Sequence, residues 1–135
     1  MEKLSKKKIC LIVLAIVIIV AAYWYYSSTQ WERDFEIRYV DYVSDKNNKD
    51  YNYYLYEITN KTNHTLTDVY AVISVETIYG DFEYEDSVSH RIKPGETVEY
   101  KLYNKDYNRE AENRGMELGA FSVYSVDIVK IKYSK

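Results

Sequence analysis

The feature that most constrains this chain is an uncharged apolar run near its N-terminus, Ile9 to Ala22, which the aromatic residues 23–26 (YWYY) follow. No charged residue occurs between Lys8 and Glu32. As a helix, the 18 residues 9–26 span roughly 27 Å, close to the hydrocarbon thickness of about 30 Å. A single segment in lipid can satisfy its backbone only as a helix, so the sequence predicts one transmembrane helix over 9–26.

Charge is unevenly divided around this run. Residues 1–8 contain Glu2 and four lysines, a net charge of +3, and the remaining 14 basic and 20 acidic residues give −6, which sums to the net −3 of the chain. Basic residues beside a transmembrane helix stay on the cytoplasmic side. We therefore expect a cytoplasmic tail at 1–8, a short linker at 27–30 and an extracytoplasmic domain at 31–135. The acidic body argues against nucleic acid as its partner.

The same N-terminus also fits a secretory signal peptide that is cleaved after Ala22. The long apolar run and the aromatic cluster favour a permanent signal anchor at the cell membrane. The only cysteine, Cys10, lies inside the apolar run, so the domain has neither an intramolecular disulfide nor a cysteine-based zinc site. Small exported eukaryotic domains are often stapled by disulfides, which makes a bacterial envelope the better expectation.

Alternation of apolar and polar residues predicts strands through the rest of the chain. One helix is expected at Tyr107–Arg114, with Glu110 and Arg114 four residues apart and Gly115 as its C-terminal stop. A single short helix among about seven strands predicts an all-β antiparallel β-sandwich. The predicted strands are 31–43, 51–59, 67–79, 82–92 (as one strand or two), one strand around 98–102, and 121–133.

The alternation also predicts which side chains face the core. Between the strands, Gly80-Asp81 is expected to break the chain, and Lys93-Pro94-Gly95-Glu96 is expected to form a type II turn. The expected inward residues are Trp31, Phe35, Ile37, Tyr39 and Val43; Tyr54, Tyr56 and Ile58; Val69, Ala71, Ile73 and Val75; Val98, Tyr100 and Leu102; and Phe121, Val123, Val129 and Ile131.

Three segments of the predicted sandwich resemble a known family: YEITN at 56–60, TNHTL at 62–66, and IKPGE at 92–96 before Val98 and Tyr100. They are similar to small immunoglobulin-like domains of bacterial envelope proteins, and in particular to the FxLYD-type group, often found behind an N-terminal anchor. The likeness covers roughly 51–103 and the last strand. It departs at Tyr79-Gly80-Asp81, where the family has a tyrosine–aspartate turn, and at an apparent insertion over 104–119. The resemblance implies that the predicted sandwich is immunoglobulin-like and lies at the envelope, and it brings no catalytic residue.

The polar motifs favour structural roles over chemistry. His64 and His90 have neither a cysteine partner nor histidine-pair spacing, so we expect no metal and no cofactor. The acidic cluster Asp81, Glu83, Glu85 and Asp86 reads as a solvated strand face, with calcium as the alternative. The sequons Asn60-Lys-Thr62 and Asn63-His-Thr65 read as turn chemistry, with glycosylation as the alternative.

A candidate partner surface comes from exposed aromatic and basic residues. In the strand containing Tyr51, Tyr53, Tyr54 and Tyr56, alternation places Tyr51 and Tyr53 outward, where tyrosines suit protein contacts, although ordinary strand packing is the alternative. The insertion adds Tyr107, Arg109 and Arg114. The sequence thus favours a non-enzymatic, membrane-tethered interaction module with a protein partner at the envelope. The alternative is a small accessory or immunity-type protein that acts through its transmembrane helix on an integral partner.

Overall fold

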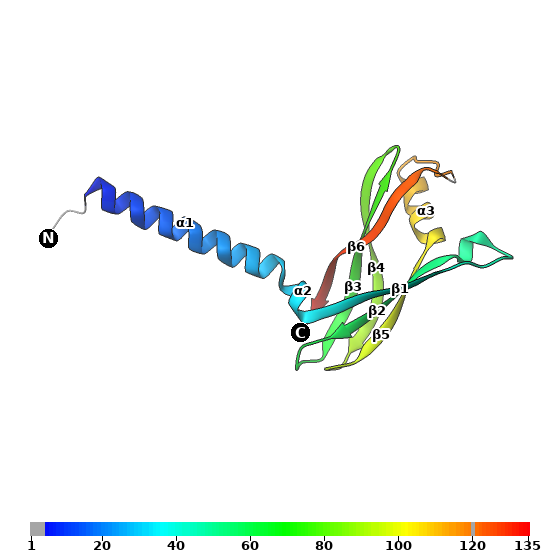
Figure 1. Ribbon diagram of the computed structural model, residues 1–135, viewed down its shortest axis with the longest axis horizontal. Helices are drawn as coiled ribbons and strands as arrows, with labels where there is room; N and C mark the ends of the chain where they lie inside the picture. Colours follow the sequence, from blue (N-terminus) through cyan, green and yellow to red (C-terminus); the bar gives the residue numbers. More distant parts are fainter. Residues whose placement is uncertain (1–4, 120) are drawn as a thin grey trace. The chain divides into compact units, whose positions relative to one another are not determined.

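The computed structural model describes residues 5–119 and 121–135, so the first half of the expected basic tail lies outside the described residues (Figure 1). By residue contacts the chain divides into two units, between Gln30 and Trp31. In order, the elements are α1 (Lys6–Ser28), α2 (Gln30–Asp34), β1 (Phe35–Val43), the 3-10 helix η1 (Lys49–Tyr51), β2 (Tyr53–Asn60), β3 (Leu66–Thr77), β4 (Gly80–Ile92), β5 (Thr97–Tyr103), α3 (Asn104–Asn113) and β6 (Val123–Ser134).

The first unit contains α1, a continuous helix of 23 residues with no buried residue. Its most apolar window has a mean hydropathy of 2.5, which makes the helix long and apolar enough to cross a membrane, as a signal anchor or a signal sequence. Ser5 caps its N-terminus, where the Ser5 hydroxyl accepts a hydrogen bond from the Lys8 amide at 3.3 Å. The hydroxyls of Ser28 and Thr29 both donate to the Tyr25 carbonyl, so helical structure continues into the expected linker.

The second unit begins with a correction, because residues 31–34 form α2 and not the start of a strand. Trp31 and Phe35 are four residues apart, so one helical turn places both on the same side as effectively as strand alternation does. Phe35 is 3% exposed and Trp31 packs against the core. The apolar pattern alone therefore could not distinguish the two structures.

Six strands form two antiparallel sheets of three, in the orders β1-β2-β5 and β4-β3-β6 (Figure 1). This corrects the expected seven strands, because Gly80 to Ile92 forms one continuous strand. With its long apolar helix and α3, the described chain is α+β and not purely all-β. Between the sheets lies one core of buried apolar side chains, among them Ile58, Ile73 and Leu102, each with no exposed surface.

The expected inward residues of β2, β3 and β5 are confirmed. Tyr56 and Ile58 of β2, Tyr100 and Leu102 of β5, and the expected four residues of β3 are all buried. Tyr54 and Val98 are half-buried against the same core.

The expected inward residues of β1 and of the segment 121–133 are partly wrong. Tyr39 pairs with the buried Tyr56 but is 52% exposed, because β1 is an edge strand. The β1–β2 register then shifts between Tyr39 and Asp41, and the extra residue pairs Val43, expected inward, with Tyr53 on the outer face. Val129 is exposed because the β3–β6 register shifts beside it, between the pairs Val72–Lys130 and Ile73–Ile128. Phe121 is 92% exposed because β6 begins only at Val123.

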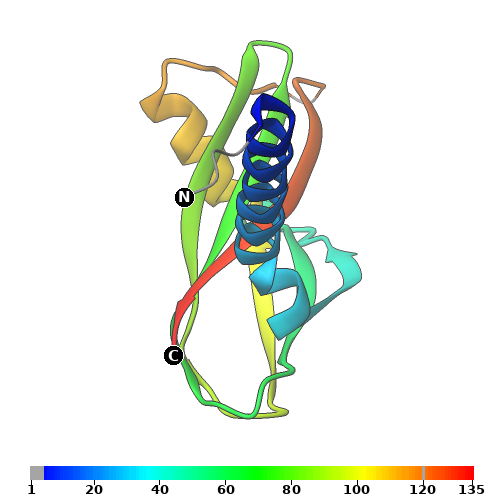
Figure 2. The same ribbon diagram turned by 90° about the vertical axis from the view of Figure 1, so that its left-hand side faces the viewer.

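The predicted turn and helix are confirmed. The Glu96 amide donates to the Lys93 carbonyl at 3.0 Å, and Gly95 has the positive φ of 74° that a type II turn requires. The helix expected at 107–114 is α3, which begins three residues earlier and ends at Asn113. Arg114, at its C-terminal end, pairs with Glu110 at 2.8 Å, and Gly115 follows at φ 76°. The helix lies beside β4 (Figure 2). The Arg114 guanidinium covers the ring of Phe82, with its central carbon 4.9 Å from the ring centre.

Candidate functional site

An open hollow in the described part of the sandwich lies where β1 ends and β2 begins. In Figure 1, β1 runs from α2 to this loop, so the hollow lies at the opposite end of the sheet from α2. Its volume is about 540 Å³. We call it the tyrosine–lysine groove, and it is lined by Val43, Ser44, Asp45, Lys46, Tyr51, Tyr53 and Tyr103.

Three tyrosine rings and three lysines dominate the chemistry of this groove. Tyr53 and Tyr103 are opposite each other on β2 and β5, with ring centroids 5.2 Å apart. The Lys101 ammonium lies 5.1 Å from the centre of the Tyr53 ring. The Lys105 ammonium lies 5.1 Å from the centre of the Tyr51 ring and 5.2 Å from that of Tyr103. Exposed cation–π contacts of this kind contribute about 0.5–1 kcal/mol each and leave the ammonium accessible.

The loop that bounds the groove is held by its own hydrogen bonds. The Asp45 carboxylate accepts from the amides of Asn47 and Asn48 at 2.8 and 3.3 Å. The Asn48 side chain caps η1 by accepting from the Asp50 amide at 3.0 Å. The Asn52 side chain accepts from the Asp45 amide at 2.7 Å, while its carbonyl accepts from Asn104 at 2.9 Å. The walls are therefore organised without a ligand.

The five residues of the expected partner surface do not come together. Tyr51 and Tyr53 lie in the groove, whereas Arg109 is exposed on α3 and pairs with Asp106 at 3.4 Å. Tyr107 is only 7% exposed, so its expected place on a partner surface is wrong; it faces the core side of α3, and burial raises its pKa. Arg114 is occupied in holding α3, since its guanidinium also donates to the Glu83 carbonyl at 3.1 Å.

Sequence reasoning missed Lys46, Lys101, Tyr103 and Lys105. The Lys101 and Tyr103 alternation on β5 could have suggested outward side chains. Their position opposite Leu55 and Tyr53 depends on register, however, and single-strand periodicity does not report register.

The histidines and the acidic cluster form no reactive centre within the described residues. No group of three or more His, Cys, Asp and Glu side chains that could hold a metal occurs among residues 5–119 and 121–135. His64 and His90 are both exposed. Asp81, Glu83 and Glu85 occupy the solvated face of β4, as expected, and Glu85 pairs with Lys132.

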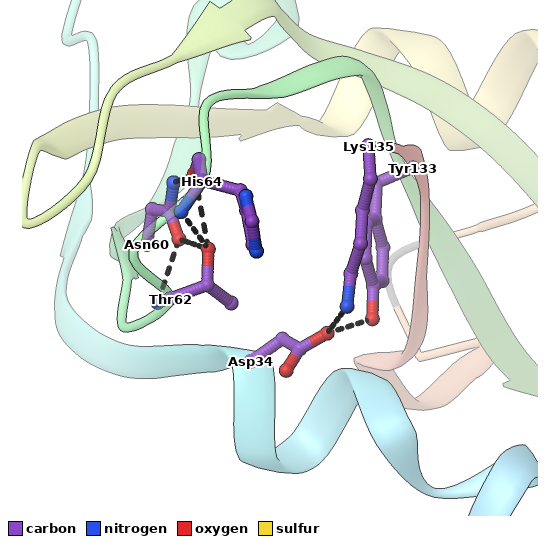
Figure 3. Close-up of polar contacts among 6 residues, drawn as sticks. All are labelled: Asp34, Asn60, Thr62, His64, Tyr133 and Lys135. Atoms are coloured by element: carbon purple, nitrogen blue, oxygen red, sulfur yellow. Dashed lines mark hydrogen bonds and ion pairs between the residues drawn. The ribbon is translucent and has the colours of Figure 1, made fainter.

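Asn60 is the hub of the turns between strands. It has no exposed surface, and its side-chain amide donates to the His64 carbonyl at 2.8 Å (Figure 3). The same amide donates to the Ile92 carbonyl at 3.0 Å. Its side-chain oxygen accepts from the amide and hydroxyl of Thr62 at 2.9 and 2.7 Å. Its backbone bonds Gly95 and Glu96. The turn interpretation of the first sequon is confirmed, because this nitrogen is buried and already bonded.

A second polar cluster joins the start and the end of the sandwich. The Asp34 carboxylate, 6% exposed as a residue, accepts a hydrogen bond from the Tyr133 hydroxyl and lies 3.8 Å from the Lys135 ammonium (Figure 3). Burial first, and the bond to Asp34 second, raise the pKa of Tyr133. The neutral tyrosine donates a hydrogen bond here, so the cluster is suited to a structural role.

A third polar cluster lies between β4, β5 and the start of α3. The Tyr100 hydroxyl donates to the Asp86 carboxylate at 2.6 Å. Burial and the nearby Asp86 raise the pKa of Asp106, which Arg109 partly offsets. The Tyr84 hydroxyl is buried and has no hydrogen-bond partner among the described residues. These groups pack α3 onto the sandwich.

No family model, curated protein or solved structure shows significant similarity to this chain, so its function has to be inferred from its own residues.

Proposed function

We propose that this protein is a non-enzymatic interaction module tethered to the outer face of the cell membrane. The observation that carries the proposal is α1, which is apolar at every position from 9 to 22 and followed after one residue by the helix that opens the sandwich. Such a helix is stable in lipid and strongly unfavourable in water.

Orientation follows from the flanking residues. Lys6, Lys7 and Lys8 begin α1 and are retained in the cytoplasm by the positive-inside preference. At the other end, Tyr23 to Tyr26 are 56–72% exposed and suit the aromatic belt of the far interface. The sandwich then lies outside the cytoplasm, and α1 remains as a signal anchor.

A binding role for the sandwich is supported by where its polar groups are used. Asn60 makes buried hydrogen bonds, and Asp34 and Asp86 accept part-buried ones, and these bonds hold loops and strands together. Exposed aromatic and cationic groups instead gather in the tyrosine–lysine groove, whose walls are pre-organised. Exposed tyrosines in such a setting are typical of recognition surfaces.

The sandwich is further proposed to be immunoglobulin-like and related to the FxLYD-type envelope domains. Two antiparallel sheets around one core are compatible with that fold. The resembling segments around Asn60 and Pro94-Gly95 meet through the bonds from Asn60 to Ile92 and Gly95. The residues that carry the resemblance therefore hold the same pair of turns together.

The tether can be tested by replacing residues 1–26 with a cleavable signal peptide, so that the sandwich is exported but soluble. Loss of the phenotype of the native protein, with the exported domain present at normal abundance, is the expected result. The control restores a single unrelated transmembrane helix and should restore function. Full complementation by the soluble domain would refute a tethered role.

An accessory protein that acts through its membrane helix is the second candidate. It is favoured by the exposure of large apolar side chains along α1, such as Leu11, Ile12 and Ile16, which could also contact an integral partner. Exchange of residues 9–26 for an unrelated transmembrane helix decides between the two. Retained function supports the tethered module, and lost function with normal membrane insertion supports the accessory role.

A further inference from the structure

We propose that the tyrosine–lysine groove binds an anionic saccharide, meaning a sugar ring that bears a carboxylate or phosphate group. The inference rests on the proposed function and names the class of ligand that the sandwich recognises. It draws on three features of the groove: its charge balance, its rings and its organised walls.

The free charges at the groove are positive. Lys46 lines it, and Lys101 and Lys105 lie over its rings; all three side chains are exposed. The single lining carboxylate, Asp45, is occupied by two amides of its own loop. Nearby, Asp106 pairs with Arg109, and Asp50 lines a different hollow against α3. An anion in the groove would therefore meet ammonium groups and little repulsion.

The rings provide a second kind of contact. Tyr51 is 50% exposed, and Tyr53 and Tyr103 are half-buried side by side. Their faces carry the negative side of the ring quadrupole, which attracts the polarised C–H groups on the apolar face of a sugar ring. Their hydroxyls can bond sugar hydroxyl groups at the same time. An inorganic anion would use only the lysines, whereas an anionic sugar would use both sets of groups.

The extent of the cationic surface limits the length of the ligand. Further along the outer face of the same sheet, Glu57 of β2 lies directly opposite Glu99 of β5. Only Glu57 has a described ion-pair partner, Arg38, at 2.7 Å. A long polyanion such as nucleic acid would cross this acidic surface. A short anionic saccharide fits within a groove of about 540 Å³ and avoids it.

The walls need little rearrangement on binding. Asn52 joins the loop to both Asp45 and Asn104, so the strand ends and α3 hold the three rings in place before the ligand arrives. Pre-organisation of this kind reduces the entropy lost on association.

The test uses the full chain in phosphatidylcholine nanodiscs, titrated by NMR with four probes at millimolar concentration: trigalacturonate, neutral maltotriose, inorganic phosphate and a short oligothymidylate. Trigalacturonate is expected to shift the resonances of Tyr51, Tyr53 and Tyr103 and to bind at least about tenfold more tightly than the other three. Added salt should weaken its binding.

Variants locate the site. Lys46→Ala and Lys105→Ala are each expected to weaken trigalacturonate binding by about fivefold, since each removes one exposed ion pair. Tyr103→Phe tests the hydroxyl with the ring retained. Lys130→Ala, an exposed lysine on β6, is the matched control and should leave affinity unchanged. NMR spectra of each variant report whether the sandwich remains folded.

Each alternative outcome overturns the inference in a recognisable way. If maltotriose binds as tightly as trigalacturonate, charge does not determine the affinity. If phosphate binds as tightly, the rings do not contribute to it. Tighter binding of the oligothymidylate would identify nucleic acid, and not a saccharide, as the ligand class. No shift with any probe, or full affinity in both lysine variants, removes the site. None of these results affects the tether experiment, so the proposed function and the ligand class fail separately.

Discussion

The hydroxyl of Tyr133, near the end of β6, donates a hydrogen bond to the carboxylate of Asp34, the residue that precedes β1, although the two lie 99 positions apart. The ring of Tyr133 also meets Phe35 edge-on, with centroids 4.9 Å apart. Because β1 and β6 are edge strands of different sheets, this hydrogen bond and this ring contact join the two sheets where the second unit begins.

Tyr133→Phe is expected to lower the free energy of unfolding of the sandwich by about 1–3 kcal/mol. The change retains the contact with Phe35 and removes only the bond to a largely buried carboxylate. Urea unfolding of the full chain in nanodiscs, followed by tyrosine and tryptophan fluorescence, measures the loss. Tyr84→Phe is the matched control, because it removes a buried hydroxyl that bonds no described residue. A loss as large for Tyr84→Phe would show that the hydrogen bond is not the cause.

Asn60→Ala is expected to destabilise the sandwich by about 3 kcal/mol or more. The substitution removes the side-chain bond to the buried Ile92 carbonyl and the bond from the Thr62 amide that holds the turn. The measurement is the same urea titration. Asn63→Ala, at an exposed position three residues away, should change stability by less than about 0.5 kcal/mol. Similar effects of the two substitutions would remove Asn60 from its role as a hub.

The sandwich is expected to lose stability steeply above about pH 10, the ordinary pKa of tyrosine. Burial raises the pKa of Tyr56 to about 12, and raises those of Tyr84, Tyr100, Tyr107 and Tyr133 as well. A raised pKa favours the neutral phenol in the folded state, so its stabilising contribution is complete below the unfolded pKa and declines as pH rises toward the folded value.

Unfolding titrations at a series of alkaline pH values measure this decline, and tyrosinate absorbance reports ionisation. Tyr56→Phe should make the dependence shallower between about pH 10 and pH 12, the window set by its shifted pKa. Tyrosinate absorbance that develops fully near pH 10 while the protein remains folded would contradict the prediction.

The protein recovered from membranes is expected to retain its first 26 residues as an anchor. Intact-mass spectrometry decides this, since cleavage after Ala22 would remove 22 residues. Ala22→Trp blocks cleavage by placing a large residue where a small one is needed, and it should leave the mass of a permanent anchor unchanged apart from the substitution. A mature chain that begins at Tyr23 would instead identify a signal peptide.

Features of this protein that depend on neighbouring residues could be predicted from the sequence alone. The apolar run to Ala22 determined α1, alternation determined the inward faces of β2, β3 and β5, and Pro94-Gly95 determined its turn, because each depends on local backbone preference or on burial of one face. Even here Trp31 was ambiguous, since helical and extended backbones place it and Phe35 on the same side.

Only the tertiary structure decided the rest. Register shifts turned Val43 and Val129 outward, and strand pairing placed Tyr53 beside Tyr103 to form the groove. Packing of α3 buried Tyr107, and the meeting of two sheet edges joined Asp34 to Tyr133. These relationships join residues far apart in the chain. Their energies come from contacts that exist only after both sheets have formed around one core, so local sequence patterns do not specify them.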